Sequence, residues 1–395
     1  MVSKEMHELG SKRSVIRELF EYGKQQAAIV GKENVFDFSI GNPTVPAPEC
    51  VKEAIIELLE TKKSDEIHGY TSAQGDFEVR KGIADYMNNT YNSQLKADNF
   101  YMTCGAAASL CITLKALTVK SEDEFIIVAP YFPEYLVFVK SAGAKAVVVP
   151  ADTENFQIQM DLLEKSINSN TKGIIINSPN NPSGVVYSEK TFKDLADLLK
   201  KKSEEYQNTL YLISDEPYRE IVYDDIQIPY VPAYYDNTIV CYSYSKSISL
   251  PGERIGYILV PDCVENAKDV YTAVCGAGRS LGYVCAPSLF QKVVLKCLGK
   301  TSDIALYDTN RKLLYNELTK MGYQCVKPDG AFYLFVKALE EDDVNFSENA
   351  KKFNLLIVPG GDFGCPGYVR VSYCVDTEML KRSFDAFKKL RGLYK

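Results

Sequence analysis

The sequence lacks the runs of side chains that mark membrane, secreted or nucleic-acid-binding proteins. It contains no stretch of about 18 uncharged apolar residues, the length needed to cross a bilayer. Its first twenty residues alternate charged and apolar side chains, so they lack the apolar centre of a secretion signal. The net charge of -7 is spread along the chain without a basic tract. We therefore expect no membrane partner and no nucleic-acid partner.

Histidine is scarce, and the cysteines are not arranged as metal ligands. The chain has only His7 and His68, and its 11 cysteines form no Cys-x-x-Cys pair. A zinc site or a histidine-based catalytic triad would have few ligands, so we expect no metal. An odd number of scattered cysteines fits a reducing compartment. The sequence therefore predicts reduced structural thiols and a cytoplasmic location.

The length of 395 residues favours two domains, because single hydrophobic cores stop growing near ~250–300 residues. With 46% hydrophobic and 25% charged residues, the composition is that of an ordinary globular protein. We predict an N-terminal arm that also forms part of a small domain (1–45), a large domain (46–290) and a C-terminal small domain (291–395). No internal repeat or low-complexity linker separates them, so the domains must pack closely.

Short apolar runs alternate with helical patterns through the middle of the chain. The runs are Phe125–Ala129, Ala146–Val149, Gly173–Asn177, Leu210–Ser214, Thr238–Tyr242 and Ile255–Val260. Continuous β-branched runs suit strands buried on both faces, as in a mostly parallel sheet flanked by helices. A helical pattern between Ser188 and Tyr206 separates two of these runs, as a βαβ crossover requires. The large domain is therefore predicted to be α/β.

The two ends of the chain show other patterns. A polar helix is expected around Ser14–Val30, followed by an extended piece at Val35–Ile40 and a turn at Gly41. After Pro287 a long helical stretch continues to Thr319. Shorter apolar runs follow at Gly330–Val336, Leu355–Val358 and Tyr368–Tyr373. Short strands between helices predict an α+β small domain.

Three predicted strands end in unusual polar clusters. These are Asn177–Gly184, Ser214–Tyr218 and Tyr242–Arg254. Ligands of open α/β sheets bind at the carboxyl ends of the strands, so the clusters should converge. Their order and spacing resemble the fold-type I pyridoxal-phosphate enzymes, specifically the class I/II aminotransferases related to aspartate aminotransferase. The resemblance extends from Gly41 to Arg370. It implies a seven-stranded large domain with a smaller α+β domain, pyridoxal 5'-phosphate as cofactor, and a homodimer with shared active sites.

The resemblance assigns the catalytic positions. Lys246 matches the lysine that holds the cofactor as a Schiff base and later acts as a base. Asp215, expected one residue past a strand end, matches the carboxylate that keeps the pyridine nitrogen protonated. Tyr218 and Asn181 match the two donors to the cofactor's phenolic oxygen. The run around Asn181 also favours a cis Asn181–Pro182 bond.

The same resemblance places a phosphate site and a ring contact. Gly105, Ala106 and Ala107 open a helical pattern, where backbone N–H groups bind anions. The family commonly has a hydroxyl or lysine here, so the two alanines leave backbone amides as the donors. Ser243 and Arg254 keep the family spacing for phosphate ligands. Tyr70 resembles the tyrosine that reaches the phosphate from the partner subunit. Phe132 occupies the position that stacks on the cofactor ring.

Arg370 interrupts an apolar strand, and a buried arginine needs an anionic partner. The resemblance implies that this partner is the substrate's α-carboxylate, with Asn181 and the backbone of Gly41 contributing. The expected reaction moves an amino group from an L-amino acid to a 2-oxo acid such as 2-oxoglutarate. A C–S β-lyase of the same fold is an alternative, as is a pyridoxal-phosphate-sensing regulator. The regulator would need a DNA-binding domain, and none is expected before Gly41.

The substrate side chain is the least constrained expectation. Arg279 lies 33 residues after Lys246, near the position of a partner-chain arginine that binds a distal carboxylate in a related subgroup. Lys115 matches a lysine that another subgroup uses for the same purpose. Both suggest an acidic donor such as aspartate. Phe132 and the 27 tyrosines could equally line an aromatic or broad-specificity pocket.

Overall fold

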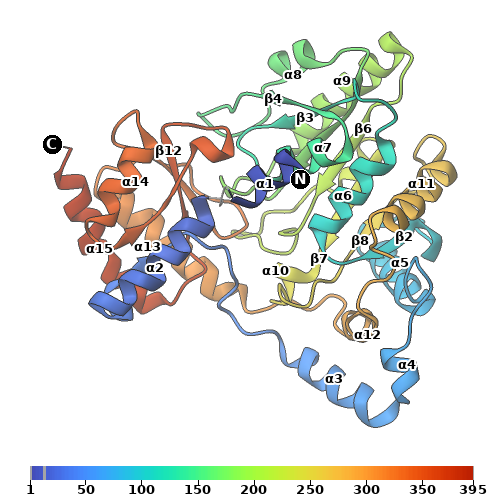
Figure 1. The fold of residues 1–395 in the computed structure, drawn as a ribbon, viewed down its shortest axis with the longest axis horizontal. Helices are drawn as coiled ribbons and strands as arrows, with labels where there is room; N and C mark the ends of the chain where they lie inside the picture. The colour runs from blue at the N-terminus through green and yellow to red at the C-terminus, as the bar shows by residue number, and fades with distance from the viewer. Residues whose placement is uncertain (1, 12–14, 395) are drawn as a thin grey trace.

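A computed structural model describes residues 2–11 and 15–394. A large mixed sheet covered by helices lies beside a smaller α+β region that contains the C-terminus (Figure 1). The predicted N-terminal helix is α2 (Val15–Val30), and its expected first residue, Ser14, lies outside the described residues. No helix in the described ranges has the length and apolar character needed to span a bilayer.

The large sheet has seven strands in the order β2-β8-β7-β6-β5-β3-β4. In this order they are Phe100–Thr103, Gly256–Leu259, Thr238–Ser243, Tyr211–Asp215, Thr171–Asn177, Glu124–Val128 and Lys145–Val149. Strands β7, β6, β5, β3 and β4 pair in parallel, whereas β8 is antiparallel to both β7 and β2. The predicted mostly parallel seven-stranded α/β fold is confirmed.

Two details of the sheet differ from the prediction. The edge strand β2 was not among the predicted runs, because its four residues, Phe-Tyr-Met-Thr, contain little of the β-branched signal. Asp215 is the last residue of β6 rather than the residue after it. It pairs in register with Asn177, the last residue of β5, and with Cys241, two residues before the end of β7, so the ends of these strands lie close together at one edge.

Both faces of the sheet are buried, which explains the continuous apolar runs. Ile175 packs on one face beneath α6 (Ala106–Leu117), α7 (Glu134–Ala142) and α11 (Ala267–Ser280). Its neighbours Ile174 and Ile176 pack on the other face, beneath α8 (Met160–Ser166) and α9 (Glu189–Tyr206). Burying each isoleucine contributes roughly 1.5–3 kcal/mol. The sheet is thus a rigid platform for the residues at its edge.

Other helices extend this cover, and local capping defines their ends. They are α3 (Glu49–Thr61), α4 (Ser64–His68), α5 (Phe77–Tyr91), α10 (Tyr244–Ser247) and α12 (Ser288–Lys296). Helix α9 begins where the sequence predicts, because the Ser188 hydroxyl accepts a hydrogen bond from the Thr191 N–H at 3.1 Å. Asp76 caps α5 in the same way.

The smaller region combines both ends of the chain. A three-stranded antiparallel sheet has the order β11 (Val358–Pro359), β12 (Tyr368–Ser372) and β9 (Tyr333–Lys337). A separate pair joins β1 (Phe36–Asp37) to β10 (Leu355–Leu356) in parallel. The helices are α2, α13 (Ile304–Lys320), α14 (Asp343–Lys351) and α15 (Thr377–Gly392), whereas α1 (Lys4–Ser11) lies against α7, where Glu5 pairs with Lys140 at 3.0 Å.

Two predicted segments in this region are each divided in the structure. The helical stretch from Pro287 to Thr319 forms α12 and α13, because Asp303 caps a new helix by accepting from the Ala305 N–H at 3.0 Å. The run Leu355–Val358 supplies two short strands that pair with different partners.

The domain boundaries after residues 45 and 290 stay predictions. The 11 cysteines, all within the described ranges, are free thiols, and only Cys241, Cys297, Cys365 and Cys374 are buried.

Candidate active site

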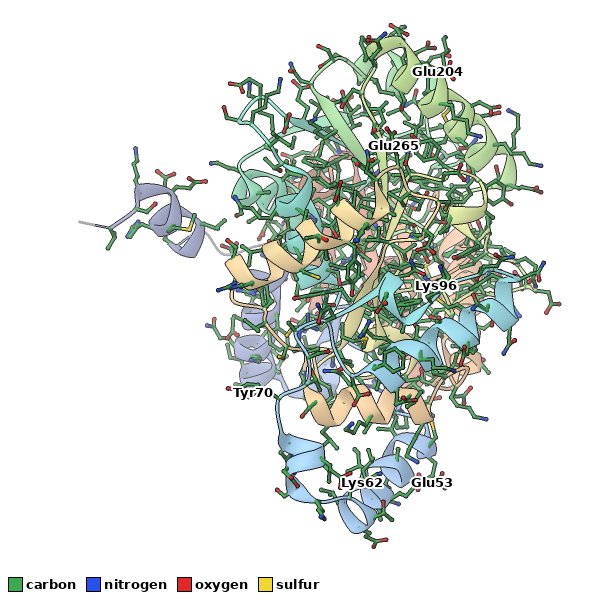
Figure 2. The ribbon with its side chains drawn as sticks, turned by 90° about the vertical axis from the view of Figure 1, so that its right-hand side faces the viewer. Glu53, Lys62, Tyr70, Lys96, Glu204 and Glu265 are labelled. Carbon is green, nitrogen blue, oxygen red and sulfur yellow. The ribbon has the colours of Figure 1, made fainter. Side chains whose placement is uncertain are left out.

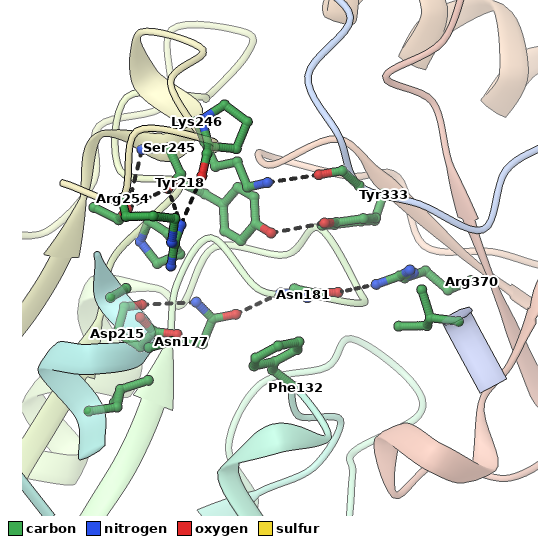
Figure 3. A pocket seen from close by; sticks show the side chains of 18 residues that line it. Phe132, Asn177, Asn181, Asp215, Tyr218, Ser245, Lys246, Arg254, Tyr333 and Arg370 are labelled. Atoms are coloured by element: carbon green, nitrogen blue, oxygen red, sulfur yellow. Dashed lines mark hydrogen bonds between the residues drawn. The ribbon is translucent and has the colours of Figure 1, made fainter. Parts of the chain in front are cut away.

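A cavity of about 280 Å³ lies where the carboxyl edge of the large sheet faces the smaller region (Figure 3). Most of the predicted site residues line it. They are Gly41, Ala106, Ala107, Phe132, Asn181, Asp215, Tyr218, Ser243, Lys246, Arg254 and Arg370. The polar clusters after β5, β6 and β7 therefore converge, as the position of each cluster after a strand predicts.

Four candidates do not line this cavity in the single chain. Tyr70 is 99% exposed and projects from the edge of the molecule (Figure 2). Arg279 is exposed in the last turn of α11. Lys115 is also exposed, and its Nζ donates to the Ala142 carbonyl at 3.4 Å. Gly105 lies directly behind the lining, in contact with Arg254.

Sequence reasoning missed several lining residues. They are Ile16, Leu110, Asn177, Pro217, Ser245, Pro251 and Tyr333. Asn177 and Ser245 could have been found, because each lies within a polar cluster at a strand end. Ile16 belongs to α2, and Tyr333 is one of 27 tyrosines, so no local pattern distinguishes them.

Lys246 lies in α10, directly after β7. The Ser243 hydroxyl caps this short helix by accepting from the Ser245 N–H at 3.2 Å. The Lys246 Nζ donates to the Gly41 carbonyl at 2.7 Å. Burial lowers the pKa of Lys246 to about 8, because the charged form loses its hydration. At pH 7 roughly a tenth of the amine is then neutral and nucleophilic, a far larger share than an ordinary lysine has.

Asp215 has one satisfied and one unsatisfied carboxyl oxygen. Its Oδ2 accepts from the Tyr135 hydroxyl. Its Oδ1 is buried and has no hydrogen-bond partner among the described residues. Burial raises the pKa of Asp215 to about 7, although the hydrogen bond from Tyr135 opposes this shift. Because an unpaired buried acceptor is costly, this oxygen is suited to a donor that binds in the cavity.

A chain of amides connects Asp215 with Arg370. The Asn177 side chain donates to the Asp215 carbonyl at 2.9 Å, and its oxygen accepts from the Asn181 N–H at 2.7 Å. The Asn181 side-chain oxygen then accepts from Arg370 at 3.0 Å. The peptide bond between Asn181 and Pro182 is cis. These contacts fix the orientation of Asn181 between the two charged groups (Figure 3).

Arg370 is buried without a carboxylate partner in the described part of the chain. Its guanidinium donates to Asn181 and to the Ser39 carbonyl, and lies over the rings of Tyr333 and Phe363 at 4.6 and 4.9 Å. Its buried Nε has no hydrogen-bond partner. Burial lowers the pKa of Arg370. A buried guanidinium with a free N–H is suited to an incoming carboxylate.

A second guanidinium lies at the start of α6. Arg254 donates to the Pro251 carbonyl at 2.9 Å and contacts the Ser245 hydroxyl at 3.5 Å. Gly105 has a φ of 86°, and a Cβ there would lie 2.9 Å from Arg254 Nη2. A side chain at this position would thus crowd the guanidinium. The hydroxyls of Ser243 and Ser245, which lie 2.6 Å apart, complete a set of donors suited to an anion.

The chain matches the family model "Aminotransferase class I and II" over residues 33–387. It is 32% identical to the aspartate aminotransferase of Thermotoga maritima over 368 residues, which cover 92% of this chain and 93% of the relative. It is 30% identical to aromatic-amino-acid aminotransferase 2 of Thermococcus litoralis over 392 residues, which cover 95% of each chain.

Solved structures agree with the sequence relatives. The crystal structure of an amino transferase from Eubacterium rectale has a TM-score of 0.99 and 63% identity, covering 100% of this chain and 99% of that one. Aspartate aminotransferase from Thermus thermophilus with maleate has a TM-score of 0.86 and 24% identity, covering 99% and 100% respectively, and is a likeness of fold. The predicted family is thus confirmed: the chain belongs to the class I and II aminotransferases, which are typically pyridoxal-phosphate-dependent, and it is an aminotransferase.

Proposed function

We propose that this aminotransferase binds pyridoxal 5'-phosphate in the cavity through Lys246 and transfers the amino group of an L-amino acid to a 2-oxo acid such as 2-oxoglutarate. One observation carries the proposal: two buried polar atoms without partners, Asp215 Oδ1 and Arg370 Nε, belong to side chains that line the same cavity as Lys246. The Asp215 oxygen is an acceptor and suits a ligand with a protonated ring nitrogen. The Arg370 Nε is a donor and suits a ligand with a carboxylate.

The residues present fit the cofactor. Asp215 would hold the pyridine nitrogen in its protonated form. The phosphate would be held by Arg254, by the hydroxyls of Ser243 and Ser245, and by the N–H groups at the start of α6. Gly105 lies directly before this helix, and its lack of a side chain leaves room for the Arg254 guanidinium. When bound, the cofactor supplies a conjugated ring that withdraws electrons from the substrate's α-carbon.

The protein's own residues would bind the substrate and move a proton. Arg370, oriented by Asn181 and the Ser39 carbonyl, would bind the α-carboxylate as a fixed positive charge. Lys246 Nζ would remove the proton from the α-carbon and hold it for return, since its pKa of about 8 lies close to neutral pH. Phe132 would pack against the cofactor ring, and Tyr218 would donate to its phenolic oxygen.

The proposal is tested on Lys246 with an exposed lysine as control. Wild-type protein incubated with pyridoxal 5'-phosphate should acquire a visible absorbance band, and borohydride should remove the band and attach the cofactor to Lys246. Lys246→Ala should lose the band and multiple-turnover transamination with 2-oxoglutarate. Lys268→Ala, exposed on α11, should behave as wild type. A Lys246→Ala protein that still completed many turnovers would refute the assignment.

We propose further that the enzyme is a homodimer in which Tyr70 enters the partner's cavity. A tyrosine that is 99% exposed beside exposed apolar side chains is unusual for a free surface. The Cys285 thiol contacts the Thr71 carbonyl at 3.6 Å, which joins the Tyr70 segment to the segment containing Tyr283 and Val284, 39% and 47% exposed. A two-fold interface over this surface would bury all three side chains.

The donor we propose is an acidic amino acid, with Arg279 of the partner subunit as the distal cation. Lys246, Arg254 and Arg370 are the only cations among the described lining residues, and each has another proposed role. A second carboxylate therefore requires a cation from elsewhere. An aromatic or broad specificity is the second candidate, because Ile16, Leu110, Phe132 and Tyr333 give the cavity an apolar wall.

A further inference from the structure

Tyr333, the first residue of β9, touches three parts of the candidate site (Figure 3). Its hydroxyl lies 2.9 Å from the Tyr218 hydroxyl. Its ring lies beneath the Arg370 guanidinium at 4.6 Å. It also approaches the backbone of Gly41 so closely that a Cβ there would lie 2.0 Å from the Tyr333 oxygen. The Gly41 carbonyl in turn accepts from Lys246.

The hydrogen bond between the two tyrosines has a direction once Tyr218 has a second partner. Among the described residues, each hydroxyl is the other's only hydrogen-bond partner. A tyrosine hydroxyl carries one proton and can also accept. If Tyr218 donates its proton to a bound group, Tyr333 must supply the proton of the shared bond. A donor that also accepts is strengthened, because successive hydrogen bonds polarise one another.

Arg370 affects the same pair from the other side. Burial raises the pKa of Tyr333 to about 12, and the positive charge of Arg370 opposes that rise. The titratable groups around the pair are Arg370 and Cys374 beside Tyr333, and Asp215, Tyr135 and Arg370 near Tyr218. A guanidinium stacked on an aromatic face is held in place by the ring as well as by its hydrogen bonds.

We propose that Tyr333 is a positioning residue: its hydroxyl holds Tyr218 as a donor into the cavity, and its ring supports Arg370 for carboxylate binding. This inference rests on the proposed function, because it concerns contacts to the cofactor and to the substrate carboxylate. The two parts of the side chain have separate roles, so they can be removed separately.

The test uses two substitutions at Tyr333 and one matched control in the holoenzyme. Tyr333→Phe removes only the hydroxyl, whereas Tyr333→Leu removes the hydroxyl and the ring. Tyr373→Phe is the control, since Tyr373 is equally buried in the same region but donates to the Ala331 carbonyl at 3.3 Å and does not line the cavity. The readouts are the pH midpoint of the cofactor's visible absorbance change and the dissociation constant of propionate, a carboxylate that cannot react.

Tyr333→Phe should raise the pH midpoint by roughly 0.4–1 unit, because a weaker Tyr218 donor stabilises the anionic phenolic oxygen less. Its affinity for propionate should stay within about twofold of wild type, since the ring remains. Tyr333→Leu should raise the pH midpoint as Tyr333→Phe does, and in addition it should bind propionate about fivefold or more weakly than wild type, because the ring is lost. Tyr373→Phe should change neither readout.

The outcomes distinguish this inference from the proposed function. A wild type that acquires no visible band with pyridoxal 5'-phosphate would refute the proposed function and this inference together. A wild type with the band, and a Tyr333→Phe variant with an unchanged midpoint, would refute the role of the hydroxyl alone. If Tyr333→Leu binds propionate as tightly as Tyr333→Phe, the ring does not support Arg370.

Discussion

Asp215→Asn provides a sharp test of the charge placed at the edge of the sheet. Asparagine has nearly the shape of aspartate, so it should keep the contact with Tyr135 and the packing of β6. It cannot carry a negative charge. The substitution therefore removes the charge from the position of the unpartnered Oδ1 and changes little else.

The magnitude follows from burial. Removing one partner of a buried, hydrogen-bonded charge pair costs roughly 2–5 kcal/mol, which corresponds to a factor of about 30 to 5,000 in rate if the pair acts in the transition state. Asp215 is buried, so water cannot replace the lost charge. We therefore expect kcat to fall by about 30-fold to 5,000-fold while the visible absorbance band of bound cofactor persists.

The assay measures single- and multiple-turnover transamination together with cofactor binding by absorbance. Asp329→Asn is a suitable control, because Asp329 also has a pKa raised by burial and accepts a hydrogen bond from the Val186 N–H, but it lies outside the cavity. It should retain wild-type rates. A loss below about tenfold in Asp215→Asn, under ~1.4 kcal/mol, would show that the charge at Asp215 does not support the reaction.

Three further predictions concern the substrate, the assembly and stability. Arg279→Ala should lower kcat/KM for aspartate by about thirtyfold or more, since a desolvated carboxylate–arginine contact is often worth ~2–5 kcal/mol. The same substitution should leave kcat/KM for alanine unchanged. Equal losses for both substrates, or a wild type indifferent to aspartate, would contradict an acidic donor. Sedimentation should show a dimer, and Tyr70→Phe should weaken cofactor binding without changing the dimer; a fully active monomer would disprove shared sites. Burial holds the pKa of Lys246 near 8, below its unfolded value of 10.5, so this group binds more protons in the unfolded chain between these pH values and its own contribution to stability rises with pH across this window. In denaturant titrations of the cofactor-free protein, the free energy of unfolding of wild type relative to Lys246→Met should therefore increase from pH 8 to pH 10; an unchanged difference would mean that Lys246 is not desolvated.

The parts of the protein that sequence patterns predict best are those with local signals. Buried parallel strands produce continuous apolar runs, and the position of Asp215 at a strand end could be placed to within one residue. The prediction of the site depended on polar clusters that follow such strands. Residues that reach the cavity from other parts of the fold carry no such signal, as Ile16 and Tyr333 show.

Short elements were also hard to predict, because tertiary pairing rather than propensity defines them. The run Leu355–Val358 reads as one strand, but its two halves pair with β1 and β12. Surface residues present a different difficulty. Tyr70 and Arg279 are exposed in the single chain, so their proposed roles depend on a second subunit whose position no pattern within one sequence specifies.

The segment from β1 to Gly41 has a consequence for how the active site comes into existence. Its Ser39 carbonyl accepts from Arg370, 331 residues away, and its Gly41 carbonyl accepts from Lys246, 205 residues away. Contacts over such separations form only after large loops close, which costs conformational entropy before any contact compensates. During synthesis, most of the chain would therefore have left the ribosome before Arg370 could meet the first forty residues. The proposed carboxylate site would thus form late, after the strands that carry Asp215 and Lys246 have been synthesised.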